Sequence, residues 1–191
     1  MTIKDLYDKY NLMPQLRVHQ LRVGGIVKLI TRDPRPILTA LVHDLGNIAK
    51  FRGLNEYWLG EQEKVWKLYG KEAHEATFAM LRDAGLRELE DCLREEGELY
   101  KNIHKLDGKY SAYSDAAVYT LYGDCRVAIN GVVSAMERVE DLENRYGDAR
   151  NDREWVFKLE EYVTKKSGIE VAKIKEDDVA PFFDELLTMT V

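Results

Sequence analysis

Apolar residues recur three or four positions apart along most of this chain, and this spacing constrains the possible fold more than any other feature. Between residues 13 and 31, for example, one helical stripe carries Leu16, Val23, Ile26 and Ile30. Long runs of alternating Val, Ile and Thr, which mark half-buried strands, do not occur in the sequence. The sequence therefore predicts an all-α fold with little or no sheet.

Proline, glycine and capping residues divide this periodic pattern into separate helices. The expected helices cover residues 13–31, 36–42, 62–84, 87–105, 114–146, 151–166 and 177–188. We expect the third to be interrupted or tightened near Gly70, and residues 52–60 to form a loop. Ser114 is the expected N-cap of the longest helix, and Gly147 is expected to end it.

Chain length and hydrophobic content indicate one core. With 191 residues and 45% hydrophobic content, we expect a domain over residues 1–146 and a short helical C-terminal extension over 147–191, packed on the same domain. The longest apolar runs are only a few residues, so we expect no membrane-spanning segment and no membrane partner. The first twenty residues lack the features of a secretory signal, which predicts a cytoplasmic location.

The charge and the cysteines narrow the classes of function. A net charge of −6 argues against a nucleic-acid scaffold, because such binding requires a basic face. A small anionic ligand could still be held by local cations or by a metal ion. Cys92 and Cys125 are isolated in the sequence, so we expect reduced packing residues and no disulfide.

The four histidines, at positions 19, 43, 74 and 104, each fall on or at the end of an expected helix. Any one of them alone is more often a packing or surface residue than a ligand. However, helical bundles do build metal sites from inward side chains on facing helices. Asp124 shares an apolar stripe with Ala117 and Leu121, and burying its charge unpaired would cost on the order of several kcal/mol. A metal ion or an arginine would provide the partner that Asp124 needs.

The adjacent pair His43 and Asp44 can diverge around such a site, because consecutive helical residues point about 100 degrees apart. Gly46 would let the backbone relax at the helix end. Mixed imidazole and carboxylate ligands suit Fe, Mn, Zn, Co or Ni better than Ca. The lack of cysteine ligands argues against a closed structural zinc site.

These residues resemble the ligand pattern of the HD-domain superfamily of metal-dependent phosphohydrolases. That pattern has a helical histidine, a His-Asp pair about two dozen residues later and a distal aspartate on a long helix, here His19, His43 with Asp44, and Asp124. The segments ALVHDLGNIAKF (40–51) and LYGDCRVA (121–128) carry the resemblance, which spans roughly residues 13–140. It implies an HD-domain helical bundle that cleaves a phosphate ester of a nucleotide or related small molecule with metal-activated water.

The resemblance also implies a metal content, which we expect to be two divalent ions drawn from Fe, Mn, Zn, Co or Ni. Members with two ions add two histidines between the His-Asp pair and the distal aspartate. The full ligand set would then be His19, His43, Asp44, His74, His104 and Asp124. Asp44 would bridge the two ions, and His74 and His104 would complete the coordination of the second ion. With one ion, His74 or His104 would be free to act as a general acid or to bind phosphate, so Asp44, His74 and His104 are the expected catalytic residues.

The substrate cannot be carried over from the family, since this chain departs from the family pattern at two places that touch substrate contacts. Members often carry Lys where this chain has Asn47, and Cys125 separates Asp124 from Arg126. The expected substrate-binding residues are Asn47, Lys105, Lys109 and Arg126. The expected partner is a small phosphorylated molecule; the oligomeric state stays open, with a homodimer as one option.

Two alternatives remain open from the sequence. Some members that resemble inositol oxygenase use the same six ligands for di-iron oxygen chemistry, and a third possibility is a non-catalytic HD regulatory module. An oxygenase should prefer iron and consume its substrate only with oxygen. A hydrolase should work anaerobically, and a regulatory module should turn over nothing.

Overall fold

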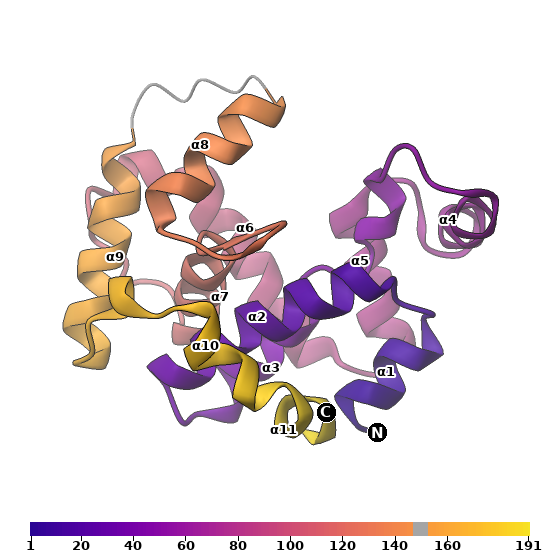
Figure 1. Ribbon diagram of the computed structural model, residues 1–191, viewed down its shortest axis with the longest axis horizontal. Coiled ribbons are helices and arrows are strands. Elements are labelled where there is room, and N and C mark those ends of the chain that lie inside the picture. The colour runs from indigo at the N-terminus through magenta and orange to yellow at the C-terminus, as the bar shows by residue number, and fades with distance from the viewer. Residues whose placement is uncertain (147–152) are drawn as a thin grey trace.

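The computed structural model describes residues 1–146 and 153–191, and over these residues the chain is all-α apart from one small hairpin (Figure 1). The all-α prediction is therefore confirmed. The expected helix end at Gly147 and the expected helix start at Asn151 lie outside the described residues. No helix of the described part of the chain is both long and apolar enough to cross a membrane.

The elements follow one another in a simple order. The α-helices are α1 (Ile3–Lys9), α2 (Pro14–Ile30), α3 (Pro34–Val42), α4 (Glu56–Tyr69), α5 (Ala73–Asp83), α6 (Arg87–Leu106), α7 (Asp115–Asp124), α8 (Ala135–Tyr146), α9 (Glu154–Ser167), α10 (Glu176–Val179) and α11 (Phe183–Thr188). The 3-10 helices are η1 (Asn47–Lys50), η2 (Val171–Lys173) and η3 (Ala180–Phe182). The strands β1 (Val127–Ala128) and β2 (Gly131–Val132) pair antiparallel, with Val127 opposite Val132.

The centre of the molecule is formed by α2, α3 and α7, which pack on one another, and α6 packs on α3 and α7 (Figure 1). A glycine sets the closest approach of α2 and α7. A Cβ added to Gly123 would lie 3.0 Å from Cγ1 of Val23 and 3.3 Å from its carbonyl oxygen. The missing side chain therefore allows the end of α7 to reach α2, where His19 is located.

The segment after residue 153 packs back on this centre. Helix α9 contacts α7 and α8, and α10 and α11 then run along α2 towards the first helix. The two ends of the chain meet there, since the Ile3 amide donates to the Met189 carbonyl at 2.9 Å and the Val191 amide donates to the Met1 carbonyl at 3.0 Å. Figure 1 shows the two termini side by side.

The expected single helix over residues 114–146 is wrong, because α7 ends at Asp124 and the β1–β2 hairpin separates it from α8. The apolar spacing of this segment resembles one continuous helix by coincidence. Gly131, with a φ of 140°, adopts a conformation that side-chain-bearing residues rarely adopt, and it begins the returning strand. The predicted N-cap is confirmed, since the Ser114 hydroxyl accepts from the Ala117 amide at 3.3 Å.

Other helix boundaries differ from the expectation at their N-terminal ends. Helix α4 already begins within the expected loop, with Asn55 as its N-cap, and α3 begins at Pro34 with Asp33 as its N-cap. Helix α1 was not expected at all, although Thr2 and Asp5 form a reciprocal capping box there. The break at Gly70 is complete and separates α4 from α5. The last expected helix is divided into α10, η3 and α11.

Candidate metal centre

Two imidazoles and a carboxylate from two helices meet at the centre of the molecule. His19 lies in the middle of α2, and His43 and Asp44 follow directly after α3. One donor atom from each of these three residues lies within 4.8 Å of the others. Nε2 of His19 is 3.2 Å from Nε2 of His43, and both nitrogens are 3.6 Å from Oδ2 of Asp44.

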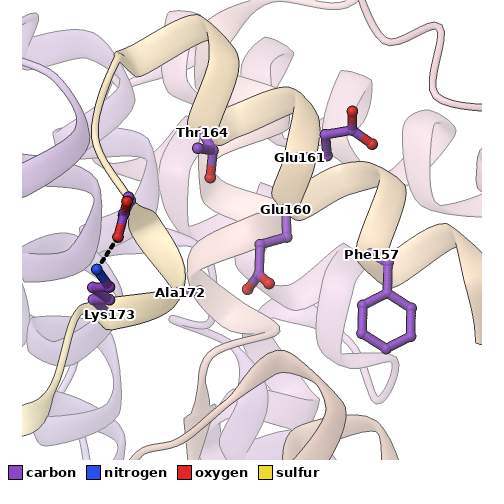
Figure 2. A pocket seen from close by; sticks show the side chains of 7 residues that line it. Phe157, Glu160, Glu161, Thr164, Ala172 and Lys173 are labelled. Atoms are coloured by element: carbon purple, nitrogen blue, oxygen red, sulfur yellow. Dashed lines mark ion pairs between the residues drawn. The ribbon is translucent and has the colours of Figure 1, made fainter.

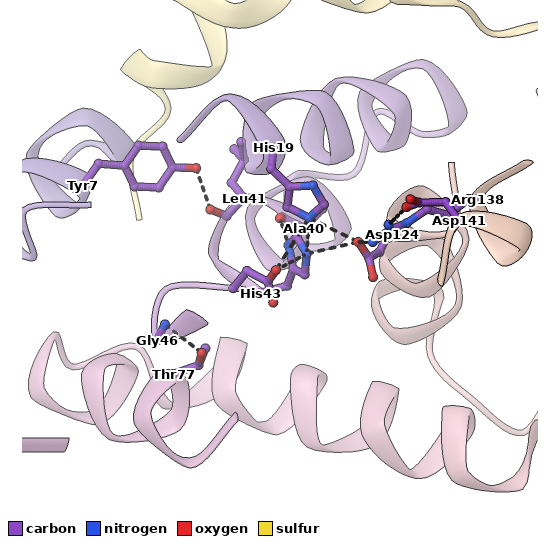
Figure 3. A network of polar contacts seen from close by, with 11 residues as sticks. Tyr7, His19, Ala40, Leu41, His43, Gly46, Thr77, Asp124, Arg138 and Asp141 are labelled. Carbon is purple, nitrogen blue, oxygen red and sulfur yellow. Dashed lines mark hydrogen bonds and ion pairs between the residues drawn. The ribbon is translucent and has the colours of Figure 1, made fainter. Parts of the chain in front are cut away.

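Asp124, the last residue of α7, adds a second carboxylate to this group (Figure 3). Its Oδ1 lies 3.1 Å from Nε2 of His19 and 3.8 Å from Nε2 of His43. Ligand atoms that share one ion at about 2.0–2.2 Å lie roughly 2.8–3.6 Å from one another. The distances from the two imidazoles to each other and to the two carboxylates are at or slightly above that range, so His19, His43 and Asp44 fit a single transition-metal ion and Asp124 lies beside them as a further donor.

The ring of His43 is oriented by its own helix. Nδ1 of His43 lies 2.7 Å from the Ala40 carbonyl oxygen, to which it donates. This hydrogen bond leaves Nε2 as the atom that faces His19 and the two carboxylates. Metal-binding histidines in proteins are commonly oriented in this way by a hydrogen bond from the second ring nitrogen.

The turn that carries His43 and Asp44 is pressed against α5 through Gly46 (Figure 3). The Gly46 amide donates to Oγ1 of Thr77 at 2.9 Å. A Cβ at Gly46 would lie 2.5 Å from the Thr77 amide nitrogen and 2.6 Å from the Ala73 carbonyl oxygen, so no side chain fits there. We expected Gly46 to let the backbone relax at the helix end. In the structure, Gly46 instead makes a close backbone contact with α5, which holds the turn in place.

The surroundings of this centre alter the protonation of His43 and Asp124. Burial disfavours the charged form of His43, but the charge of Asp44 and the contact with Asp124 outweigh it and raise the pKa of His43 to about 9. Burial also opposes ionisation of Asp124, yet the contacts with His19 and His43 hold its pKa well below its usual range. Without an ion, the centre is therefore held together by an imidazolium and a carboxylate.

Two further residues face this centre that the sequence did not point to. Burial and the nearby charge of Asp124 raise the pKa of Glu96, on α6, to about 8. Arg138, on α8, places Nη2 4.0 Å from Oδ1 of Asp124 (Figure 3). A signal existed for Glu96, because it interrupts the apolar stripe formed by Leu93, Tyr100 and Ile103. Arg138 had none, because its placement depends on the hairpin before α8.

The other two histidines do not join the group. His74, in the first turn of α5, and His104, near the end of α6, are both exposed. The ring of His104 instead packs edge-on against Trp155, with 6.1 Å between ring centroids. Among the described residues, the geometry thus favours the one-ion alternative over the full six-ligand set.

Arg126, an expected substrate-binding residue, lies inside the protein. It is 1% exposed, and its five N–H donors all have acceptors within the protein. These acceptors are the Tyr122 hydroxyl and the carbonyl oxygens of Val133, Val171, Ala172 and Ile174. Arg126 therefore joins the hairpin and the C-terminal segment to α7 and has no donor left for a substrate.

The remaining expected substrate contacts lie apart from the four ligands or inside the protein. Asn47, at the start of η1, is 4% exposed. Lys105 is exposed in the last turn of α6, and Lys109 is exposed in the turn that follows.

Both expected cysteine assignments are confirmed, since Cys92 and Cys125 are free thiols.

A separate surface hollow of about 290 Å³ lies on α9 and η2 (Figure 2). It is lined by Phe157, Glu160, Glu161, Thr164, Glu170, Ala172 and Lys173. Its one lysine pairs with Glu170, and none of its residues belongs to the metal group. The hollow is thus unrelated to the candidate centre.

No known protein family, curated protein or solved structure matches this chain.

Proposed function

We propose that this protein is a metal-dependent phosphohydrolase of the HD type, in which His19, His43, Asp44 and Asp124 hold one divalent ion. The observation that carries the proposal is that Nε2 of His19 and Nε2 of His43 lie 3.2 Å from each other and 3.1 to 3.8 Å from a carboxylate oxygen of Asp44 and of Asp124. The four residues come from α2, from the turn after α3 and from the end of α7. Their mixture of imidazole and carboxylate suits Fe, Mn, Zn, Co or Ni.

The residues of the chain prepare the site in three ways. Ala40 orients His43, so that its Nε2 faces the other donors. Asp44 and Asp124 provide negative charge that favours a cation. Glu96, with a pKa near 8, can exchange a proton at neutral pH and is the candidate general acid or base. A bound ion would polarise a phosphate oxygen and lower the pKa of a coordinated water.

The substrate class follows from the family resemblance. We propose a phosphate ester of a nucleotide or a related small molecule, because many superfamily hydrolases act on nucleotides. The alternative di-iron oxygenase would need His74 and His104 as ligands, and both are exposed away from the group. No feature of the described residues favours that alternative or the regulatory module over a hydrolase.

The experiment is elemental analysis of protein purified without chelator, followed by phosphate release from a panel of nucleotides with Mn²⁺ added, with and without oxygen. About one ion per chain and oxygen-independent phosphate release would support the proposal. Iron with oxygen-dependent substrate loss and no phosphate release would replace it with the oxygenase. Absence of both metal and turnover would favour the regulatory module.

A further inference from the structure

We infer that Arg138 is the phosphate-binding residue of this centre, with its guanidinium group placed to hold the phosphate oxygens of the substrate beside Asp124. This inference rests on the proposed function and adds to it a residue outside the HD pattern. It is carried by the position of Arg138, by its unused donors and by the contrast with Arg126.

The side chain of Arg138 lies next to Asp124 and is almost fully buried. Its Nη2 lies 4.0 Å from Oδ1 of Asp124, and its side chain is only 11% exposed. In Figure 3, Asp124 lies between the two histidines on one side and Arg138 on the other. A group bound beside Asp124 would therefore meet both the ion and the guanidinium.

One edge of this guanidinium lacks a hydrogen-bond acceptor in the described part of the chain. Nη1 of Arg138 donates to Oδ2 of Asp141 at 2.8 Å, which fixes the orientation of the plane. Among the described residues, the Nε–H is buried without a partner, and Nη2 lies 4.0 Å from Oδ1 of Asp124. The Nε and Nη2 donors form the fork that binds two oxygens of a phosphate at once.

An unpaired buried donor is unfavourable, and native proteins rarely leave one. Arg126 in the same chain shows the usual structural arrangement, in which every guanidinium donor has an acceptor in the protein. Arg138 differs in that its buried Nε–H lacks an acceptor among the described residues, beside an Nη2 that faces Asp124. Phosphate oxygens would supply the acceptors that this edge lacks.

The three cations that the sequence suggested are less suited than Arg138 to bind a phosphate at this centre. Arg126 has no donor left, while Lys105 and Lys109 are exposed. The main alternative role for Arg138 is simple compensation for the negative charge of Asp124, Asp44 and Glu96. That role makes a different prediction, because removing a cation from an acidic centre should strengthen metal binding and leave phosphate binding unchanged.

The test compares Arg138→Gln, which removes the charge, and Arg138→Lys, which keeps the charge but removes the fork. Arg94→Gln is the control, since Arg94 pairs with Glu90 on α6 and makes no contact with the four ligands. Three quantities are measured: metal content, the affinity of the Mn²⁺-loaded protein for inorganic phosphate by calorimetry, and KM and kcat for a nucleotide ester. Melting temperatures show which variants fold.

We expect Arg138→Gln to retain its metal and to bind phosphate about 10- to 100-fold more weakly, with a matching rise in KM. Arg138→Lys should lie between this variant and the wild type, and Arg94→Gln should equal the wild type. If Arg138→Gln does not fold, the charged lysine variant decides the question by its phosphate affinity.

Unchanged phosphate affinity in a folded, metal-loaded Arg138 variant would overturn the inference. The proposed function would fail independently of this inference if the wild type binds metal and phosphate but releases no phosphate from any ester. In that case, weaker phosphate binding by the variants would still identify Arg138 as the anion-binding residue.

Discussion

Nε2 of His19 lies 3.1 Å from Oδ1 of Asp124, although the two residues belong to helices that are far apart in the sequence. This contact exists because Gly123 lets the end of α7 approach Val23 on α2. The candidate centre is therefore a consequence of helix packing, and changes in that packing should affect it.

The first prediction concerns this close approach. Gly123→Ala would place a Cβ 3.0 Å from Cγ1 of Val23, and we expect it to destabilise the fold by about 1–3 kcal/mol and to reduce metal content. Gly60→Ala is the control, since its Cβ would meet nothing within 4 Å inside α4, and it should stabilise the protein by roughly 0.5–1 kcal/mol. Urea denaturation and elemental analysis measure both effects. Equal stability of the two variants would contradict the packing argument.

The second prediction separates the two possible ligand sets. Asp44→Ala should lose both bound metal and turnover, whereas His74→Ala should keep its single ion, because His74 is exposed away from the other ligands. Metal analysis and phosphate release test each variant. Loss of about half of the bound metal in His74→Ala would restore the two-ion site.

The third prediction concerns the stability of metal-free protein as a function of pH. The pKa of His43 is raised from its usual value of 6.5 to about 9, so its protonated form stabilises the fold. This stabilisation is fully present below pH 6.5 and is lost as the pH rises through 9, by on the order of 1–3 kcal/mol. Denaturation of chelator-treated protein at several pH values measures it.

His43→Gln provides the control for this pH dependence, because it removes the titrating group. The variant should show a flatter profile between pH 6.5 and 9. Metal affinity should change in the opposite direction and rise with pH, since an ion binds the neutral imidazole. A profile that is the same in the variant and the wild type would show that another group is responsible.

The fourth prediction is that Arg126 acts on stability and not on substrate binding. Arg126→Gln leaves buried carbonyl oxygens of Val133, Val171 and Ile174 without their donor, and we expect a loss of about 3–5 kcal/mol. The C-terminal segment should also become more sensitive to protease. A variant of unchanged stability with a raised KM would instead support a role in substrate binding.

Several features of the fold could be predicted because their causes are local. Ser114 caps α7, and Gly85 and Gly168 follow the ends of α5 and α9 with positive φ, as their residue types favour. The break at Gly70 has the same origin. The hairpin after Asp124 could not be predicted, since the apolar spacing of residues 124–132 suits a helix as well as a short β-hairpin.

The same division applies to the candidate centre. The sequence order predicted His19, His43 and Asp44 as one group, which the structure brings together with Asp124 beside the two imidazoles, but it equally suggested His74 and His104, which lie outside the group. Sequence order cannot distinguish these cases. A histidine on a helix joins the group only if its helix presents it to the same point as the others.

The sequence by itself therefore determined the all-α class, the cap at Ser114 and the residue types available for a metal, because these depend on composition and on neighbours within a few positions. Tertiary structure alone decided that Arg126 is an internal anchor and that Glu96 and Arg138 face the ligands. The physical reason is that these roles depend on how α6, α7 and α8 pack, and packing is set by the combined shape of side chains that are distant in the sequence.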